Sequence, residues 1–244
     1  MTKFWVSPAI DVLSKPDFSP VSALPMNNLG VSSPGEQLIE YAGRLCYMSQ
    51  SNASNKTTAE YIDNIMKQGH GSVLEHCNFS LLIQGVSRAL THELTRHRAG
   101  TAISQLSQRY VDASDTDFVI PPVLLESGNS GLVEEFKAQC LAAQASYAKL
   151  SETIAVNTDN KVLQRKRRRE AARSVLANAA ETKLVWTANV RALRHVITLR
   201  GNEGADLEMI RFSKALLAVV APLAPACFAD ITASEFVEPA YLKV

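Results

Sequence analysis

The chain has 244 residues, a formal net charge of +1 and a hydrophobic content of 46%. This composition excludes a disordered chain and a protein that coats nucleic acid through its overall charge. The length allows one large domain or two small ones, in either case with a sizeable buried core.

The cysteines and the apolar runs indicate the cellular setting. The four cysteines are widely spaced and form no CxxC pair. We therefore expect buried, reduced thiols, with neither a zinc ribbon nor a disulfide framework. The first residues, MTKFWVSPAIDVL, lack the apolar core of a signal peptide. The longest apolar run, at 215–228, is interrupted by Pro222 and Pro225 and is too short to cross a bilayer. We expect a cytoplasmic protein.

The N-terminal part of the chain predicts loops followed by two helices. Five prolines in residues 7–34 predict that the first 34 residues are largely irregular. Helices are expected at about 34–47 and 57–68, on either side of a polar turn. Thr58 is a possible cap of the second helix.

The next part predicts a strand, a helix and a long connection. The apolar run at 77–85 predicts a strand. From Val86 the apolar residues fall at helical spacing, which predicts a helix that ends near Gly100. Residues 112–132 carry Asp, Pro and Gly signals and predict a connecting loop around the short apolar piece FVIPP.

The C-terminal half predicts a mainly helical core. A long helix is expected to carry one apolar stripe, formed by Phe136, Cys140, Tyr147, Leu150 and Ile154. We expect further helices at about 161–178, 189–200 and 204–221, and a short strand at 183–188. There is no internal repeat and no clear linker, so we expect a single α+β domain over residues 1–244, dominated by helices.

Residues 96–110, RHRAGTAISQLSQRY, hold the strongest chemical signal. They contain three arginines, one histidine, two serines and two glutamines, and no carboxylate. This excess of donors and positive charge favours an anionic ligand such as a phosphate. For RHR alone, a cationic helix C-terminus that complements the helix dipole is the plainer explanation. A turn that brings residues 105–109 back past the helix end would enclose two phosphate groups.

Two other polar clusters allow alternative interpretations. The segment HGSVLEH at 70–76 lacks the spacing of helical zinc motifs, so we expect no metal site there. His70 and Glu75 are candidate site residues, although a structural role is the simpler one for each. The run RKRRRE at 165–170 resembles a nucleic-acid stripe, but it has no interleaved aromatic residues and favours a solvated face. Arg173 lies deeper in an apolar pattern.

The segment TANVRALRHVITLR, at 187–200, adds further candidates. Asn189, Arg191 and His195 lie at a predicted strand-to-helix junction and along the helix that follows. Arg200 lies among apolar residues and therefore needs an anionic partner, either a carboxylate or a ligand. The chain has no GxGxxG, no Walker loop and no nucleophile elbow. Any bound nucleotide must have its phosphates held by side-chain cations.

With these residues assembled, the chain closely resembles the flavin-dependent thymidylate synthases. The family hallmark is Arg-His-Arg, then seven residues, then Ser, in a phrase that ends S-x-R-Y. Here Arg96, His97 and Arg98 form its start, and SQRY at 107–110 forms its end. GHGSVLEH at 69–76, SRALTHELTRHR, and TANVRALRH…LR followed by ADLE at 205–208 also match. These matches span about residues 40–228.

One departure from the family pattern concerns the spacing within the hallmark. Eight residues, AGTAISQL, stand between Arg98 and Ser107, where the family has seven. We interpret the extra residue as a bulge near 101–103, which leaves SQLSQRY aligned.

The resemblance implies a fold, ligands and site residues. The implied fold is helix-rich around a small, mostly antiparallel sheet, assembled as a homotetramer with active sites shared between subunits. Each site would bind FAD, dUMP, methylenetetrahydrofolate and NADPH, with no metal, membrane or nucleic acid as partner. The residues implied for FAD are Ser72, Arg96, His97, Arg98, Gln105, Asn189, Arg191 and His195. Of the residues implied for substrates, His70 corresponds to a family histidine near the folate and flavin. The others are implied for dUMP, and they are Glu93, Arg96, Gln105, Leu106, Ser107, Gln108, Arg109, Arg173 and Arg200.

The implied reaction is reductive methylation of dUMP to dTMP. Uracil C5 is a poor nucleophile, and a cation against the pyrimidine favours ionisation at N3 and raises electron density at C5. Arg200 is the residue expected to act in this way. Two competing hypotheses remain: a relative of the same fold with altered or lost activity, which the longer loop favours, and a non-catalytic RNA-binding protein, which the basic run favours.

Overall fold

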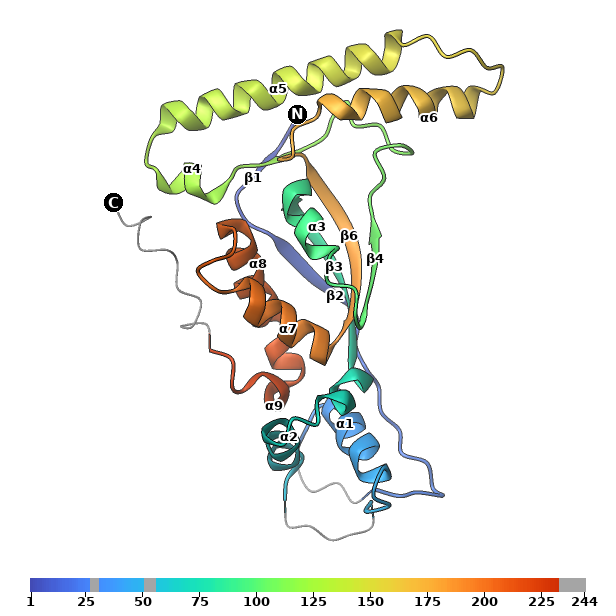
Figure 1. Ribbon diagram of the computed structural model, residues 1–244, viewed down its shortest axis with the longest axis vertical. Helices are drawn as coiled ribbons and strands as arrows, with labels where there is room; N and C mark the ends of the chain where they lie inside the picture. The colour runs from blue at the N-terminus through green and yellow to red at the C-terminus, as the bar shows by residue number, and fades with distance from the viewer. Residues whose placement is uncertain (27–30, 51–55, 233–244) are drawn as a thin grey trace.

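The structure is a computed structural model, and it describes residues 1–26, 31–50 and 56–232. The molecule is elongated, with a helical hairpin at one end, a sheet in the middle and a group of short helices at the other end (Figure 1). This is the α+β class expected from the sequence. No helix in the described part of the chain is long and apolar enough to span a bilayer.

The central sheet has four strands in the order β2-β3-β6-β4, and every neighbouring pair is antiparallel. Residues 79, 81 and 83 of β3 lie opposite 188, 186 and 184 of β6, and all six side chains are buried on one face. Helices α7 and α8 pack on this face, where Trp186 and Phe212 lie 6.4 Å apart (Figure 1). The strands are β2 (Ala9–Ser14), β3 (Asn78–Ser87), β4 (Thr101–Gln105) and β6 (Glu181–Asn189), and the helices are α7 (Val190–Arg200) and α8 (Leu207–Val220).

Two short helices with capping boxes form the far end of the molecule. Ser33 caps α1 and pairs with Glu36, and Thr57 caps α2 and pairs with Glu60. The cap expected at Thr58 is wrong by one residue, because Thr57 is the cap. Its hydroxyl accepts a hydrogen bond from the backbone N–H of Glu60, and the Glu60 carboxylate accepts one from the backbone N–H of Thr57. The elements at this end are α1 (Pro34–Leu45), α2 (Thr58–Lys67), the 3-10 helix η1 (Gly71–His76), η3 (Ala221–Leu223) and α9 (Pro225–Phe228).

The hairpin at the other end consists of α5 and α6. Tyr147 of α5 is fully buried, and its hydroxyl accepts a hydrogen bond from the backbone N–H of Ala113 at 3.1 Å. The expected helix at 161–178 ends earlier, because α6 stops at Ala172 and a 3-10 turn follows. The elements here are β1 (Phe4–Trp5), which pairs in parallel with β5 (Phe118–Val119), α4 (Pro122–Glu126), α5 (Ser130–Thr153), α6 (Lys161–Ala172) and the 3-10 helix η2 (Arg173–Val175).

In three places pairing between distant segments overrides the local pattern, and the predicted start and end of the helix after Val86 are wrong. The N-terminal segment contains β2, which adds to the edge of the sheet beside β3. Val86 lies in β3, because a bulge at Gly85 (φ +66°) lets the strand continue to Ser87. The following helix, α3 (Arg88–Leu94), is therefore short and ends before Gly100. Cys46 is also an exception to the expected buried thiols, since it is exposed while the other three are buried.

Candidate functional site

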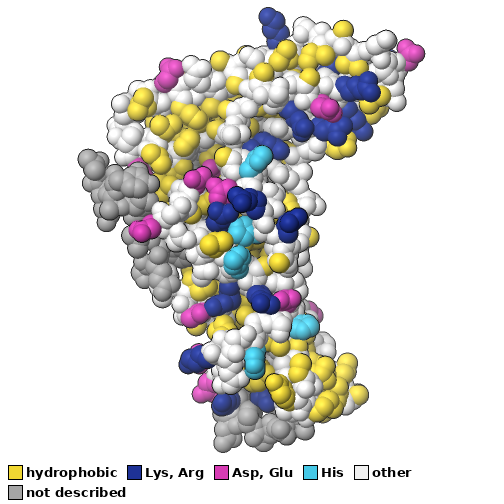
Figure 2. Space-filling view, viewed as in Figure 1, with side chains coloured by type: hydrophobic (Ala, Val, Ile, Leu, Met, Phe, Trp, Pro, Cys, Tyr) yellow, Lys and Arg dark blue, Asp and Glu magenta, His cyan; other side chains and the backbone are white. Residues whose placement is uncertain are grey.

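Several clefts lined by cations lie on the surface of the molecule. Lys, Arg and His side chains gather along the middle of the face shown in Figure 2, beside a few carboxylates. The helix α3 (Arg88–Leu94) connects two of these clefts, because Arg88 and His92 line one of them and Glu93 forms an ion pair with Arg200, which lines the other. No cluster of three or more His, Cys, Asp or Glu side chains able to hold a metal is found in the residues that the structure describes.

The first cleft, the Arg200 cleft, has a volume of about 540 Å³ and is lined by residues from the turn after α3, from α7 and from the turn after α7. Arg200 ends α7, and its Nη1 forms an ion pair with Oε2 of Glu93 on α3 at 2.7 Å. Its Nε donates a hydrogen bond to Nε2 of His97 at 3.0 Å. The anionic partner that the sequence required for Arg200 is therefore a carboxylate of the same chain. Arg96 and His195 line the same cleft.

His97 stands among cations in this cleft. Its ring lies edge-on to that of His195, with 5.5 Å between the centroids. Burial lowers the pKa of His97 below its ordinary value, and the positive charges of Arg200, His195 and Arg96 lower it further. Because Nε2 accepts from Arg200, the imidazole is neutral here. With this ring neutral, the positive charge of the cleft lies on the guanidiniums of Arg96 and Arg200.

A smaller hollow of about 360 Å³ lies on the other side of His97 and contains Arg98 and Gln105. The Gln105 amide nitrogen already donates to the hydroxyls of Thr91 at 3.0 Å and Thr182 at 3.2 Å. Only its carbonyl oxygen therefore remains as a ready contact for a ligand. Asn189, another expected cofactor residue, is buried and caps α7 through Ala192 N–H at 2.8 Å.

The second cationic cleft, the Arg88 cleft, has a volume of about 450 Å³. Arg88 and His92 of α3 face Gln108 and Arg173 across it. The Arg88 Nη1 atom is buried and has no hydrogen-bond partner in the described part of the chain. Burial lowers the pKa of Arg88, and the charge of Arg173 lowers it further. Two guanidiniums held near each other, one with an unsatisfied buried donor, are suited to a phosphate.

The sequence does not mark Arg88 and His92 as site residues. Their spacing of four residues places both on one side of α3, which is a signal that they act together. What they face was not visible in the sequence, because Arg173 lies 85 residues after Arg88.

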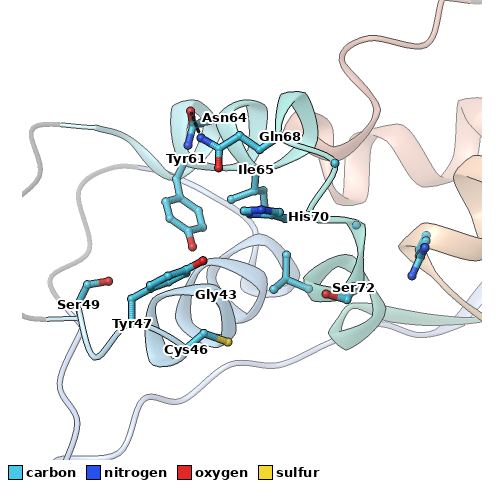
Figure 3. Close-up of a pocket in the computed structure, with 14 residues that line it drawn as sticks. Gly43, Cys46, Tyr47, Ser49, Tyr61, Asn64, Ile65, Gln68, His70 and Ser72 are labelled. Atoms are coloured by element: carbon cyan, nitrogen blue, oxygen red, sulfur yellow. Dashed lines mark hydrogen bonds between the residues drawn. The ribbon is translucent and has the colours of Figure 1, made fainter.

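The third cleft, the tyrosine cleft, has a volume of about 510 Å³ between α1, α2 and η1. His70 and Ser72 line it together with Arg191 of α7, so three expected site residues meet here. Arg191 forms an ion pair with Glu75 at 2.7 Å. Figure 3 shows the rings of Tyr47 and Tyr61 facing each other across the cleft, with His70 beside them. Gly43 permits this arrangement, because a Cβ atom there would overlap the Tyr61 hydroxyl.

The end of the hallmark, residues 106–110, is held against α6. Arg109 pairs with Glu170 at 3.0 Å, and Arg169 donates to the Tyr110 carbonyl at 2.7 Å and to Asp112 at 2.9 Å. The Lys166 ammonium lies 4.7 Å from the centroid of the Tyr110 ring. Part of the basic run therefore holds this segment in place and is not simply a solvated face. Leu106 is exposed, and the Ser107 hydroxyl accepts from the Arg109 backbone at 3.3 Å.

The middle of the hallmark is a strand, not a bulged loop. Residues 101–105 form β4 and pair with residues 188–184 of β6 without a register shift. The expected bulge at 101–103 is therefore wrong. Gly100 in that turn has φ +70°, and its Cα lies close to the Asn189 amide. The strand β4 runs back alongside α3. The Thr101 hydroxyl donates a hydrogen bond to the His97 carbonyl, and the Gln105 amide donates one to the Thr91 hydroxyl.

Clefts lined by Arg and His side chains, in a chain without a glycine-rich phosphate loop, are suited to anionic ligands. Residues 29–226 match the family model described as "Thymidylate synthase complementing protein" (Thy1). This match covers most of the chain, and the chain therefore belongs to the Thy1 family of flavin-dependent thymidylate synthases.

Curated relatives support this assignment over most of both chains. A flavin-dependent thymidylate synthase of Mycobacterium sp. (strain JLS) is 45% identical over 205 residues, which is 80% of each chain. That of Mycobacterium avium (strain 104) is 42% identical over 226 residues, covering 91% of this chain and 88% of the relative. That of Mycobacterium tuberculosis (strain ATCC 25177 / H37Ra) is 41% identical with the same coverage. The chain is thus an enzyme with flavin-dependent thymidylate synthase activity, and the family expected from its motifs is confirmed.

A solved structure supports the fold. The crystal structure of the UMP/dUMP methylase PolB from Streptomyces cacaoi, bound with 5-Br UMP, matches with a TM-score of 0.71. The match covers 98% of this chain and 99% of that one at 20% sequence identity. The expected arrangement of helices around an antiparallel sheet is therefore confirmed.

Proposed function

We propose that the enzyme converts dUMP to dTMP, with methylenetetrahydrofolate as carbon donor, NADPH as reductant and FAD as cofactor. The observation that carries this proposal is the placement of two unlike sites on α3. Arg88 at its start faces Arg173, and Glu93 near its end holds Arg200. Five residues of helix separate these sites by about 7.5 Å along the axis. Five residues also turn the helix by about 140°, so the two sites lie on different sides of α3, and the mononucleotide would run around the helix with its phosphate at one site and its base at the other.

In this pose the phosphate lies in the Arg88 cleft. Arg88 and Arg173 supply the charge, and Gln108 supplies an amide from a side chain that is only 9% exposed. Ser107 and Arg109 are the chain neighbours of Gln108, and Leu106 precedes them in the same segment. The unsatisfied Nη1 of Arg88 would gain the partner that it lacks.

The uracil then lies near the Arg200 cleft. Arg200 is fixed by Glu93 and His97, so its guanidinium approaches a ring without first losing rotamer freedom. A fixed cation beside the pyrimidine favours the N3 anion and raises electron density at C5, where the new carbon is attached. Arg96 lines the same cleft and adds to this positive potential. No covalent nucleophile of the enzyme is needed.

The hydrogen-bond donors on both sides of His97 are suited to bind FAD. Arg96, Arg98 and Arg191 are exposed cations for its phosphates, and His97 and His195 offer ring edges. Ser72 adds a hydroxyl from the tyrosine cleft, whereas Gln105 and Asn189 contribute mainly through the backbone that they order. When bound, FAD supplies the hydride that completes the methyl group after its reduction by NADPH.

The tyrosine cleft suits a flat, partly polar ring. Tyr47 and Tyr61 offer aromatic faces, and His70 lies between η1 and α2 beside them (Figure 3). We assign the region of His70 to the folate, in line with the family resemblance. The same region borders Arg191 and Glu75, so folate and flavin would lie close together.

We also propose that the enzyme is a homotetramer with shared active sites. The cationic clefts are open at the surface of one subunit, and the α5–α6 hairpin projects from one end (Figure 1). Leu132, Leu141 and Val162 are exposed on that hairpin. A second subunit packed there would bury these side chains and bring its own residues toward the clefts. Light scattering on the purified protein measures the assembly.

A direct test combines a flavin spectrum with product formation. The purified protein should show bound flavin after reconstitution with FAD, and should form dTMP from dUMP only when methylenetetrahydrofolate and NADPH are both present. Arg200→Ala should abolish turnover, while Arg200→Lys should retain a small part of it. A colourless protein after reconstitution would rule out this function, whereas full activity of Arg200→Ala would rule out the role proposed for Arg200 in ionising the uracil. Rescue of a thymidine-requiring bacterium separates the active enzyme from a relative of the same fold that has lost activity.

A further inference from the structure

The side-chain amide of Gln105 is held in one orientation by two buried threonines. Its nitrogen donates one hydrogen bond to the hydroxyl of Thr91 on α3 at 3.0 Å and another to the hydroxyl of Thr182 on β6 at 3.2 Å. Thr91 is 2% exposed and Thr182 is fully buried, whereas Gln105 is half-buried and lines the hollow beside His97. The amide therefore links a helix and a strand on one side and borders a ligand-sized space on the other.

The proton of Thr91 determines which way round the amide lies. The Thr91 hydroxyl has one proton and donates it to the backbone carbonyl of Arg88 at 3.0 Å, and a carbonyl can only accept. The Thr91 oxygen therefore accepts from Gln105, and the atom that faces it has to be the amide nitrogen. If the amide were turned over, two oxygens would face each other with no proton between them. Both N–H protons of the amide are thus in use, and its carbonyl oxygen, Oε1, is left for the hollow.

Other neutral polar groups of this hollow also present acceptors. The hydroxyls of Thr95 and Thr101 donate to backbone carbonyls at 3.2 Å and 2.7 Å, so the oxygen of each is left to accept. Arg98 is a donor at the same hollow, and Ile103 adds an apolar wall. An acceptor at Gln105 and a guanidinium nearby are complementary to a cyclic imide, in which a ring N–H lies between two carbonyl groups.

We propose that Thr91 and Thr182 are positioning residues that fix the Gln105 carbonyl oxygen as the acceptor for the imide N–H of a bound ring. This role deepens the FAD site proposed above and rests on it. The isoalloxazine ring of FAD and the uracil ring of dUMP both contain an imide. Because the uracil is assigned to the Arg200 cleft, on the opposite side of His97, the isoalloxazine is the ring for this hollow. The threonines act through Gln105 and touch no reacting atom.

The first arm of the test needs no ligand. A double-mutant cycle of Gln105→Met with Thr91→Val, on the full-length protein, measures in the free energy of unfolding whether the amide and the hydroxyl interact. A second cycle pairs Gln105→Met with Thr182→Val. Favourable coupling is expected in both cycles, and serine in place of either threonine should retain it, because serine keeps the hydroxyl. A cycle without coupling would remove the threonine concerned from the proposal, whether or not the protein binds FAD.

The second arm compares FAD with 3-methyl-FAD, whose imide nitrogen carries no proton. The wild-type protein should bind FAD roughly 10- to 100-fold more tightly, because the methylated ring leaves the Gln105 carbonyl without a donor. In the Thr91→Val/Thr182→Val double variant the amide can turn over, so this preference should largely disappear. A steric clash with the methyl group would persist in the variant, and loss of the preference therefore reports the hydrogen bond. A uniform loss of affinity for both flavins, with the preference unchanged, indicates packing alone and contradicts the proposal.

Matched variants and a second ligand pair complete the test. The Thr91→Ser/Thr182→Ser double variant should keep the wild-type preference, as should Thr153→Val, which removes an exposed hydroxyl that donates to a backbone carbonyl at 2.8 Å. The preference for dUMP over 3-methyl-dUMP should not change in the valine variants. If that preference falls while the flavin preference stays, the hollow holds the uracil and the flavin assignment is overturned. A wild-type protein that binds FAD without preference overturns the imide contact alone, whereas one that binds no FAD overturns the cofactor site as well.

Discussion

Arg200 donates a hydrogen bond from Nε to Nε2 of His97 across 3.0 Å, and so joins the end of α7 to the turn after α3. The bond links the residue proposed to act on the uracil with a residue proposed to hold the flavin. It also determines the protonation state of His97, because a protonated imidazole has no lone pair to accept it.

The first prediction concerns pH and stability. The folded-state pKa of His97 lies below its ordinary value of 6.5, owing to burial first and then to Arg200, His195 and Arg96. Above pH 6.5 the ring is neutral in both states and its contribution to stability is complete. As the pH falls from 6.5 toward the folded pKa, the unfolded chain takes up the proton first, so the free energy of unfolding decreases. His97→Asn should lack this decrease, as followed by denaturant unfolding at several pH values. An unchanged pH slope in the variant would show that His97 is not the group responsible.

The second prediction concerns the phosphate. Arg88→Ala and Arg173→Ala should each weaken dUMP binding by roughly 10- to 100-fold, the worth of one charged hydrogen-bonding partner. Binding of deoxyuridine, which has no phosphate, should change little in either variant. Arg165→Ala, which removes an exposed arginine from α6, is the matched control. If deoxyuridine weakens as much as dUMP, the Arg88 cleft does not hold the phosphate.

The third prediction concerns the turn before β4. Gly100→Ala should lower the free energy of unfolding by more than about 2 kcal/mol, because the new Cβ meets both a positive φ and the Asn189 amide. Gly128→Ala has a similar φ of +65° but open space around the Cβ, so it should lose only about 1–2 kcal/mol. Equal losses in the two variants would mean that the contact with Asn189 has no energetic weight.

The fourth prediction concerns the extra residue of the hallmark. Deleting Ala102 shifts one side of β4 by one position, so side chains that face inward turn outward. We expect this variant to lose flavin binding and most of its stability. Deleting Ala99, in the turn, should retain the strand pairing and most of the bound flavin. Measured flavin content and unfolding of the two deletions decide between the positions, and the reverse order of tolerance would place the extra residue within the strand.

The comparison of β4 with α1 and α2 explains which elements the sequence could predict. The capping boxes at Ser33 and Thr57 involve only residues three apart, so both helix starts could be located to within one residue. Residues 101–105 have mixed polarity and half-exposed side chains, and they form a strand because β6 offers a free edge. That edge is supplied by residues 79 to 87 positions later, which no local pattern reveals.

The sequence by itself determined the family, the cations of the hallmark and the need of Arg200 for an anionic partner. Those features depend on residue identity and short spacing, and they are readable without a fold. Only the tertiary structure decided that the partner is Glu93, 107 residues earlier, and that Arg88 shares a cleft with Arg173. The physical reason is that charge and hydrogen-bonding capacity belong to single residues, whereas their partners are selected when the sheet and its covering helices bury their apolar faces together.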